Sequence, residues 1–333
     1  MRAGSDRNKP FAQWRFEDLP ARPRVAHRYF DAESSTVVVA SEPFGEIATH
    51  VVSYGRSDAP PLLLIHGLMT TSYSWRYMFE RLGERYRLVV PDLPGAGRSA
   101  IPARGRRYTG AALATFIGEL QDALGLAGCL TVGNSLGGYL CMRAALEEPG
   151  RFARLASIHP PALPEPRLVA LHAGIRVPGA KAALTHVVRH APRRWAHKNV
   201  HYYDESLKSL EEAREYGAPL ASEEGAGAFA GYLADALHPR ELRAFERELR
   251  RRRDSGAGFP VPLMLAYALE DPTVPPKVGR RLQPLVPDAE FHWLEHTSHF
   301  VQVDTPDHLA ALLTDFLVPD EPELTRTGAA RSR

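Results

Sequence analysis

The sequence has little cysteine and no long apolar run. Only Cys129 and Cys141 occur in 333 residues, and their apolar surroundings are typical of core thiols rather than of a disulfide framework or a metal site. A run of about 18 apolar residues, the length that a membrane span requires, occurs nowhere, and the N-terminus lacks the apolar stretch of a signal peptide. We therefore expect a cytoplasmic protein from a reducing compartment.

The sequence also has little excess charge of either sign. Lysine and arginine number 41 and aspartate and glutamate 39, which leaves a net charge of +2. So small an excess gives no electrostatic reason to expect nucleic acid or a membrane surface as a partner. The densest basic run, four arginines at residues 250–253, ends a helical pattern, where cations interact favourably with the helix dipole. We expect this run to be a solvated helix end.

The composition is that of a globular protein with a sizeable core. Apolar residues make up 44% of the chain and charged residues 24%, and the length suits one large α/β domain with an insertion, or two average domains. Residues 1–33 show little periodicity and are predicted to form an N-terminal arm that lies on the domain through Phe11, Trp14 and Phe16. Residues 319–333 have no apolar pattern and are expected to be a disordered tail.

Short apolar runs bounded by glycine and proline are the clearest secondary-structure signal. Residues 35–41 and 46–55 flank a turn containing Pro43 and Gly45, and they predict an antiparallel hairpin. Later runs are apolar at nearly every position, as strands covered on both faces must be. They are residues 61–67, 85–95, 128–135, 155–160, 261–271 and 289–298. Together the runs predict an α/β fold with a mostly parallel eight-stranded sheet flanked by helices.

Helical patterns separate most of these strands, as at residues 73–82, 109–124 and 136–147, which predicts right-handed βαβ crossovers. Residues 161–258 interrupt this alternation, because they show several helical stretches and no strand pattern. Such a segment between two sheet strands is expected to form a separate layer. We assign residues 34–160 and 259–318 to the α/β core and residues 161–258 to an inserted helical cap.

The segment Gly133-Asn134-Ser135-Leu136-Gly137 has the pattern G-x-S-x-G between a predicted strand and a predicted helix. In this pattern the chain turns sharply, so that the serine Oγ stands above the carboxyl end of the sheet beside the amides of the helix N-terminus. The flanking residues are small because strand and helix approach closely. A tight turn without chemistry is the alternative, but the strand before and the helix after favour a nucleophilic Ser135.

A serine hydroxyl is a weak nucleophile until an imidazole takes its proton and a carboxylate orients that imidazole. After a strand-turn-helix nucleophile, the acid and then the histidine follow in loops after late strands. Asp271 and His299 occupy those positions, and they are predicted to complete a catalytic triad with Ser135.

Other residues compete for both roles. Glu270 directly precedes Asp271, but successive strand residues point to opposite faces, and Asp271 is the one that opens the loop. His299 is favoured over its neighbours because it stands in the loop after Thr297 and Ser298. The remaining competitors are His292 and His296 for the base and, more remotely, Glu165 for the acid.

A tetrahedral intermediate also needs hydrogen-bond donors for its oxyanion. One is expected to be the backbone amide of Leu136, directly after the nucleophile. The other is expected to be the amide of Leu68, in the loop that follows residues 61–67, where His66 and Gly67 turn the chain. His66 itself is interpreted as a structural residue that braces this loop.

The segments LLLIHGLMTTSYSW, VVPDLPGAGRS, VGNSLGG, LEDPTVPP and SHF stand in the order found in the α/β-hydrolase superfamily, which the chain resembles over residues 35–318. It most resembles the capped branch, which includes haloalkane dehalogenases, epoxide hydrolases, carboxylesterases and C–C bond hydrolases. The resemblance implies the α/β-hydrolase fold with a helical cap.

Departures from these relatives narrow the expected chemistry. Dehalogenases and epoxide hydrolases of the branch use an aspartate nucleophile, and this chain has Ser135. The C–C bond hydrolases share Gly-Asn-Ser, but their oxyanion loop is rich in glycine and tryptophan usually follows their catalytic histidine, where this chain has Phe300. A serine esterase with an acyl-enzyme intermediate is therefore the predicted function. A C–C bond (β-ketone) hydrolase, an acyltransferase and a non-hydrolytic ligand-binding protein stay open as alternatives.

The substrate is expected to be a small to medium hydrophobic ester held beneath the cap. Aromatic residues are more often core than pocket when taken singly, but a helical cap usually encloses a largely apolar site. The predicted substrate-binding residues are Trp75, Trp195, Tyr203, Phe229, Tyr232 and Phe300. No metal is expected, since the sequence shows no cluster of metal ligands, and no nucleotide cofactor is expected, since Gly95 and Gly97 lack the third glycine of a dinucleotide fingerprint. The chain is expected to be a monomer or a homodimer.

Overall fold

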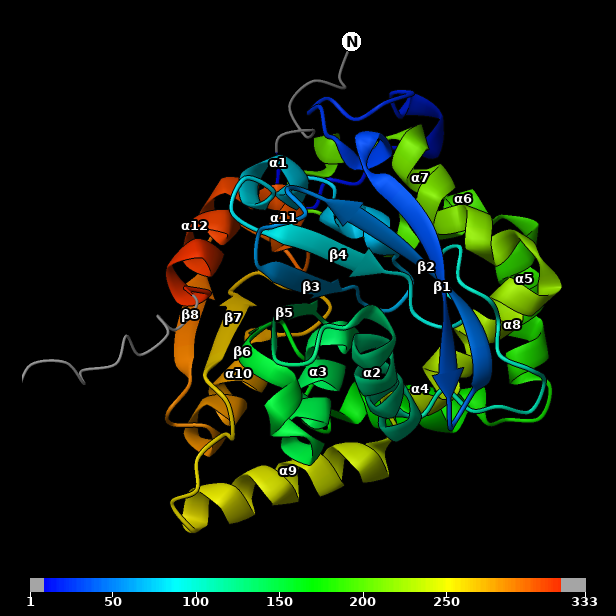
Figure 1. Cartoon of the computed structure of the whole chain (residues 1–333). Coiled ribbons are helices and arrows are strands. Elements are labelled where there is room, and N and C mark those ends of the chain that lie inside the picture. The colour runs from blue at the N-terminus through cyan, green and yellow to red at the C-terminus, as the bar shows by residue number, and fades with distance from the viewer. Residues whose placement is uncertain (1–8, 319–333) are drawn as a thin grey trace, which may run out of the picture.

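The computed structural model describes residues 9–318, so the predicted tail and the first eight residues lie outside the described part of the chain. A sheet of eight strands forms its centre (Figure 1). The strands are β1 Glu33–Ser41, β2 Gly45–Tyr54, β3 Pro61–Ile65, β4 Arg87–Pro91, β5 Cys129–Asn134, β6 Phe152–Ile158, β7 Leu263–Ala268 and β8 Glu290–Leu294.

The sheet has the order β1-β2-β4-β3-β5-β6-β7-β8. β1 and β2 form an antiparallel hairpin, β2 pairs antiparallel with β4, and the remaining neighbours are parallel. This arrangement confirms the predicted α/β fold with a mostly parallel eight-stranded sheet.

Both faces of the sheet are covered, which explains why the central strands are apolar at nearly every position. In β3, Leu63 and Ile65 belong to the core on one face, whereas Leu62 and Leu64 belong to the core on the other. Figure 1 shows α2 and α3 on one side of the sheet and α1, α11 and α12 on the other. The core helices are α1 Met78–Leu82, α2 Gly110–Leu124, α3 Leu136–Glu147, α10 Pro276–Leu282, α11 Val301–Asp304 and α12 Pro306–Phe316.

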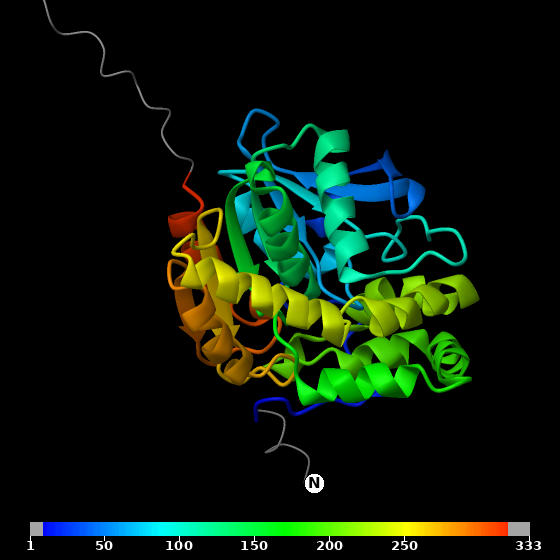
Figure 2. The ribbon, with the colours of Figure 1, turned by 90° about the horizontal axis from the view of Figure 1, so that it is seen from below.

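The insertion between β6 and β7 is helical, and most of it forms a layer of its own beside the sheet (Figure 2). We use "cap" for its first five helices, α4 Pro166–Ile175, α5 Ala180–His190, α6 Pro192–Asn199, α7 Leu210–Gly217 and α8 Glu223–Asp235. Short 3₁₀ turns, Glu205–Leu207 and Ala218–Ala221, lie on either side of α7.

The sixth helix of the insertion, α9 Pro239–Asp254, departs from the assignment of residues 161–258 to the cap. Its Phe245 ring packs edge-on against Tyr139 of α3, with 5.3 Å between the ring centroids. Its Glu241 accepts a hydrogen bond from the amide of Ala111 at the start of α2. The cause is the strong amphipathic pattern of α9, whose apolar side, Leu242, Phe245 and Leu249, faces the core helices.

The described part of the N-terminal arm lies against the cap. The amide of Phe11 donates to the carbonyl of Tyr203 at 3.0 Å, and His197 Nε2 bonds the carbonyl of Trp14 at 2.9 Å. Further along, the amide of Leu210 donates to the carbonyl of Pro20 at 2.8 Å. In Figure 2 the dark-blue start of the chain runs along the outer side of the cap helices. The arm therefore ties residues 197–211 of the cap in place.

A buried charge network also joins this part of the cap to the core. Arg76, which follows the 3₁₀ helix Ser72–Trp75, is fully buried and donates to Glu212 of α7 at 2.8 Å. Tyr202 donates to the same carboxylate, while Tyr73 donates to Glu211 at 2.8 Å. Charges removed from water are costly to separate once they are paired, so α7 is firmly attached to the core.

The two cysteines lie in the interior. Cys129 and Cys141 are buried free thiols, as predicted for core residues.

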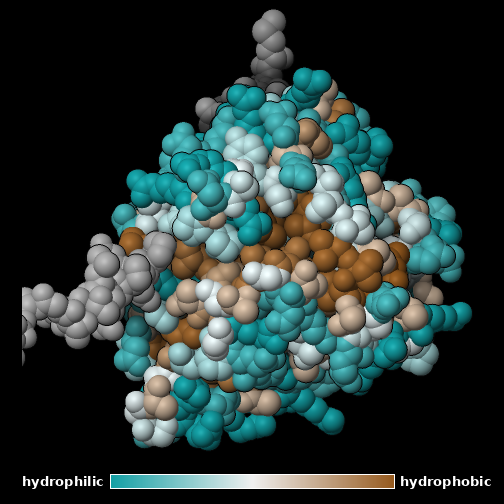
Figure 3. All heavy atoms as spheres, in the orientation of Figure 1, coloured by the Kyte–Doolittle hydropathy of each residue, from teal (hydrophilic) through white to brown (hydrophobic). Residues whose placement is uncertain are grey.

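On the face shown in Figure 3, apolar atoms gather across the middle and hydrophilic atoms surround them. Val38 on the edge strand β1 is 61% exposed, the largest exposed fraction among the large apolar residues of the described chain. Within residues 9–318, no helix is long and apolar enough to cross a membrane.

Candidate active site

Ser135 stands at the sharp turn between β5 and α3. Its backbone angles are φ 55° and ψ −121°, an uncommon conformation for a residue with a side chain. Its amide donates to the carbonyl of Ile158 on the neighbouring strand β6 at 2.7 Å, which holds the turn at the sheet edge. Backbone strain of this kind persists only where the surroundings enforce it, and it is concentrated at functional sites.

The glycines of the pattern allow the close approach that this turn requires. A Cβ atom on Gly137 would lie 2.5 Å from the carbonyl oxygens of Ile65 and His66, and one on Gly133 would lie 2.6 Å from the backbone of Gly137. Strand pairing puts Ile65 beside Gly133, so the loop after β3 begins directly next to Ser135. A Cβ on Gly67 in that loop would lie 3.1 Å from Ser135 Cβ.

Replacing Gly137 with alanine is expected to lower the free energy of unfolding by about 3 kcal/mol, because the new methyl group has no room beside two backbone carbonyls. Urea unfolding of both proteins measures the difference. Gly150 is a matched control, since a Cβ there meets nothing within 4 Å, and Gly150→Ala should leave the stability nearly unchanged. Equal stabilities for the Gly137 and Gly150 variants would contradict the packing argument.

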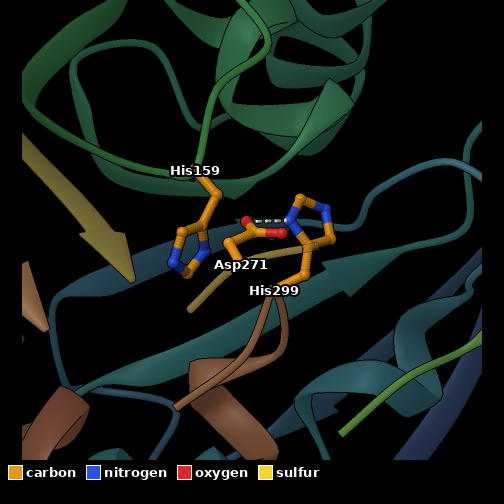
Figure 4. Close-up of side chains that lie close together, drawn as sticks. All are labelled: His159, Asp271 and His299. Atoms are coloured by element: carbon orange, nitrogen blue, oxygen red, sulfur yellow. Dashed lines mark hydrogen bonds and ion pairs between the residues drawn. The ribbon is translucent and has the colours of Figure 1, made fainter. Parts of the chain in front are cut away.

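The imidazole of His299 and the carboxylate of Asp271 form a buried pair. His299 Nδ1 bonds Asp271 Oδ2 at 2.6 Å, and the other ring nitrogen of His299 points away from Asp271 (Figure 4). Asp271 Oδ1 accepts the amides of Thr273 at 2.6 Å and Val274 at 2.9 Å. Burial alone would raise the pKa of Asp271, but the attraction and hydrogen bond of His299 more than offset it and hold the pKa below its ordinary value.

The competing residues have other partners. His292 bonds Glu290, and His296 bonds the hydroxyl of Tyr203 at 3.1 Å. Glu165 is buried at the rim of the site, where it pairs with Lys277 and with Arg281, each at 2.6 Å. The structure therefore brings Asp271 and His299 together and places these competitors in separate pairs.

His159 is a site residue that the sequence interpretation missed. It directly follows β6 with a left-handed φ of 49°, and its amide donates to Ala266 of β7 at 2.8 Å. Its buried ring lies beside Asp271 (Figure 4), with its centroid 5.4 Å from that of His299, and neither ring nitrogen has a hydrogen-bond partner within the described residues. Burial lowers the pKa of His159 to about 3, so the ring is neutral. The available signal was its position at the carboxyl end of a parallel strand.

Asp304 of α11 fixes the loop that carries His299. Its carboxylate accepts the amide of Ser298 at 2.8 Å and the amide of Tyr203 at 2.9 Å, so it connects the histidine loop to the cap. Burial raises the pKa of Asp304 to about 6, even though these hydrogen bonds act in the opposite direction.

This raised pKa predicts a pH-dependent stability. Between the unfolded pKa and the folded one, the folded protein binds the proton more tightly, so stability falls as the pH rises from about 4 to about 6. A shift of this size corresponds to about 3 kcal/mol. Asp304→Asn should remove this pH dependence of stability. The free energy of unfolding is measured for the wild type and the variant at both pH values, and the difference between the two proteins should change with pH. A difference that does not change with pH would contradict the raised pKa.

Two backbone amides lie beside the candidate nucleophile. Leu136 is the first residue of α3, and Leu68 follows Gly67 in the loop after β3. Within the described residues neither amide donates a hydrogen bond, so both are available to an anionic oxygen. His66 Nδ1 bonds the carbonyl of Gly67 at 2.8 Å, and its Nε2 accepts the amide of Leu93 at 3.0 Å. This buried ring braces the loop, the role the sequence predicted.

A cavity of about 520 Å³ lies between the core and the cap and opens onto these groups. Ser135 and His299 line it from the core, and α4, α5, α6 and α8 of the cap provide much of the remainder. Its aliphatic lining residues include Leu163, Leu168, Leu171, Leu184, Leu233, Val274 and Val278. The volume and the apolar lining are typical of small-molecule sites.

Most of the predicted pocket residues line this cavity, and two do not. Trp195, Phe229, Tyr232 and Phe300 line it, as do the predicted oxyanion-hole residues Leu68 and Leu136. Trp75 was wrongly placed there: its side chain is fully buried in the core beneath β3 and β4, with Phe79 and Leu88. Tyr203 was also wrongly placed, because its ring packs against Phe11 of the arm and its hydroxyl bonds His296.

The described residues contain one group of three side chains that could hold a metal ion, namely His159, Asp271 and His299, whose ligand atoms lie within 4.8 Å of one another. Both oxygens of Asp271 are already engaged, by His299 and by two backbone amides, which is the pattern of a carboxylate that orients an imidazole.

The loop with Gly95 and Gly97 encloses the carboxylate of Asp92, which accepts the amides of Ser72 and Arg98.

Comparisons with known proteins agree with this architecture. The family model of the alpha/beta hydrolase fold matches residues 60–306. Haloalkane dehalogenase 2 of Mycobacterium tuberculosis is 30% identical over 272 residues, which cover 80% of this chain and 90% of that one. The uncharacterized hydrolase YugF of Bacillus subtilis is 24% identical over 275 residues, which cover 79% of this chain and 92% of that one. The structure of a thermophilic esterase from Thermogutta terrifontis superposes with a TM-score of 0.66 at 21% identity, covering 86% of this chain and 98% of that one.

Proposed function

The chain belongs to the alpha/beta hydrolase fold family, and from this premise we propose that it is a serine hydrolase that cleaves a small to medium hydrophobic carboxylic ester through an acyl-enzyme. One observation supports the proposal above all others. A serine in a strained turn and an imidazole bonded to a buried carboxylate line the same apolar cavity.

The proposed reaction assigns each group one task. His299 accepts the proton of Ser135 as Oγ attacks the ester carbonyl, and Asp271 holds the ring so that its free nitrogen is the base. The amides of Leu68 and Leu136 stabilise the oxyanion of the tetrahedral intermediate. The protonated His299 then gives its proton to the departing alkoxide, and water, activated by the same imidazole, hydrolyses the acyl-enzyme.

The substrate class follows from the cavity. Leucine and valine side chains dominate its lining. An apolar acyl or alkyl group that enters the cavity displaces water from these side chains, which favours binding. The volume of about 520 Å³ admits a small to medium molecule but not a bulky polymer. An ester of this kind presents its carbonyl to Ser135 while its apolar groups occupy the space beneath α4 and α8.

The proposal is tested with a panel of p-nitrophenyl esters of short and medium acyl chains, together with a fluorophosphonate probe. We expect turnover of several esters, covalent labelling at Ser135, and a burst of p-nitrophenol if deacylation is slower than acylation. Failure both to turn over any ester and to react with the probe would refute the proposal.

The alternatives give different products. A C–C bond hydrolase would cleave a β-ketone substrate and leave the esters intact, whereas an acyltransferase would pass the acyl group to an added alcohol or thiol. A binding protein would retain a ligand with turnover slower than minutes. Product analysis of the ester reaction, with and without an alcohol acceptor, therefore distinguishes hydrolysis from each of these outcomes.

A further inference from the structure

The hairpin of α4 and α5 exposes an unusual amount of apolar surface. Val169 is 44% exposed, Val177 57% and Val187 54%. None of the residues of α4 is fully buried, although most are apolar. Leu168 and Leu171 of this helix line the cavity, and Leu171 is also 43% exposed. Large exposed apolar side chains gathered on one short segment indicate an interaction surface.

The chain from α4 through α6 is strongly basic, whereas the whole chain is nearly neutral. Between Glu165 and Asp204 the sequence contains no acidic residue, yet it contains Arg167, Arg176, Lys181, Arg189, Arg193, Arg194 and Lys198. The sequence-based expectation of no membrane partner rested on the net charge of +2, which averages this segment with acidic regions elsewhere.

Several of these cations are not neutralised by the protein itself. Arg189 pairs with Glu223, and Arg194 pairs with Glu17 of the arm. Within residues 9–318, no carboxylate forms an ion pair with Arg176 or Lys181. A groove between α5 and residues 101–106 adds Arg104, Arg106 and the exposed Ile101, and Glu223 and Glu224 of α8 line the same groove.

We propose that the outer surface of α4 and α5 docks on an anionic lipid surface. A helical segment with aliphatic side chains among lysine and arginine fits the boundary between acyl chains and anionic headgroups, because the valines enter the apolar layer while the cations meet the phosphates. The docking requires no membrane-spanning helix.

Charge and side-chain type argue against a second copy of the chain or a nucleic acid as the partner of this surface. A second copy of the chain, paired through the same surface, would bring two acid-free basic segments together, and their charges would repel. A nucleic acid would meet the cations, but exposed valines provide no stacking platform for bases. A lipid surface is complementary to both the charge and the apolar side chains.

Docking would bring the cavity to the lipid. α4 lies between the solvent and the cavity, since Leu168 and Leu171 line the cavity while Val169, and Leu171 itself, are also exposed to solvent. An apolar molecule dissolved in the lipid layer would then meet the cap at the helix that lines the site. The proposal concerns the surface alone and does not depend on the ester chemistry.

The test is co-flotation of the full chain, as the Ser135→Ala variant so that no lipid is hydrolysed, with vesicles of phosphatidylcholine alone or mixed with phosphatidylglycerol. We expect binding to the anionic vesicles that weakens as salt is added. Arg176→Glu/Lys181→Glu should lower it by at least about tenfold. Val169→Ser/Val177→Ser/Val187→Ser, which keeps every charge, should also lower it.

A matched control separates the local surface from the total charge. Arg243 and Arg247 of α9 are exposed, and Arg243→Glu/Arg247→Glu changes the net charge by the same amount while binding should persist. Equal binding to neutral and anionic vesicles, or undiminished binding of the Arg176→Glu/Lys181→Glu variant, would overturn the proposal. So would a stable dimer dispersed by the valine substitutions, or binding to an oligonucleotide without binding to vesicles.

Discussion

Replacement of Ser135 with alanine is expected to reduce p-nitrophenyl ester turnover by about 10⁵- to 10⁶-fold and to abolish fluorophosphonate labelling. The variant retains the cavity, the amides of Leu68 and Leu136 and the Asp271–His299 pair, but it has no atom that can form the acyl-enzyme. The activity that remains would come from binding and oxyanion stabilisation alone.

Two measurements keep this result interpretable. The thermal unfolding of Ser135→Ala should resemble that of the wild type, since the substitution removes one oxygen atom and leaves the turn glycines in place. Ser57→Ala, at an exposed serine, should keep full activity and labelling. Persistent ester turnover by a folded Ser135→Ala protein would assign the nucleophile to another group.

Replacement of His299 with alanine is expected to reduce activity about as severely as loss of Ser135, because the hydroxyl then has no base. Asp271→Asn should reduce it less, by about 10³- to 10⁴-fold, because the imidazole remains but its orientation and tautomer are no longer enforced. Steady-state kinetics of the three variants with one ester give the comparison.

His296 provides the control for the base, because it lies three residues from His299 and bonds Tyr203 rather than Asp271. His296→Ala should keep activity close to that of the wild type. If the His296 and His299 variants lost activity equally, the assignment of the base would be wrong. Combining Ser135→Ala with His299→Ala should cost little more than either change alone, since the two groups act in one step.

The sheet and the nucleophile turn could be predicted because their signals are local. Strands buried on both faces are apolar throughout, and Gly133 and Gly137 are needed wherever strand and helix meet so closely. Asp271 and His299 could be predicted because parallel strands bring their carboxyl ends to one edge. Their hydrogen bond joins residues that are distant in sequence, and the shared edge is what made it foreseeable.

Other placements depend on the side of the sheet on which a segment packs, and no local sequence pattern indicates that side. Trp75 closely follows the loop after β3, yet the chain there turns into the core around Arg76. Tyr203 is aromatic and belongs to the cap, but the arm covers it. α9 has a helical pattern like the cap helices, and only its contacts with α2 and α3 reveal that it belongs to the core.

The buried Arg76–Glu212 pair and the N-terminal arm have a consequence for how molecules enter and leave. Both secure α7 and its neighbouring residues. By contrast, α5 rests on α8 through apolar side chains and the solvent-exposed Arg189–Glu223 pair, and α4 bonds α8 through His172 Nδ1 and the carbonyl of Ala234. Parting α4 and α5 from α8 breaks dispersion contacts, one solvent-exposed ion pair and one hydrogen bond, whereas lifting α7 would leave a guanidinium and a carboxylate unpaired in the buried interior. Ligand exchange should therefore proceed by an asymmetric swing of α4 and α5, with the α7 end as the stationary hinge.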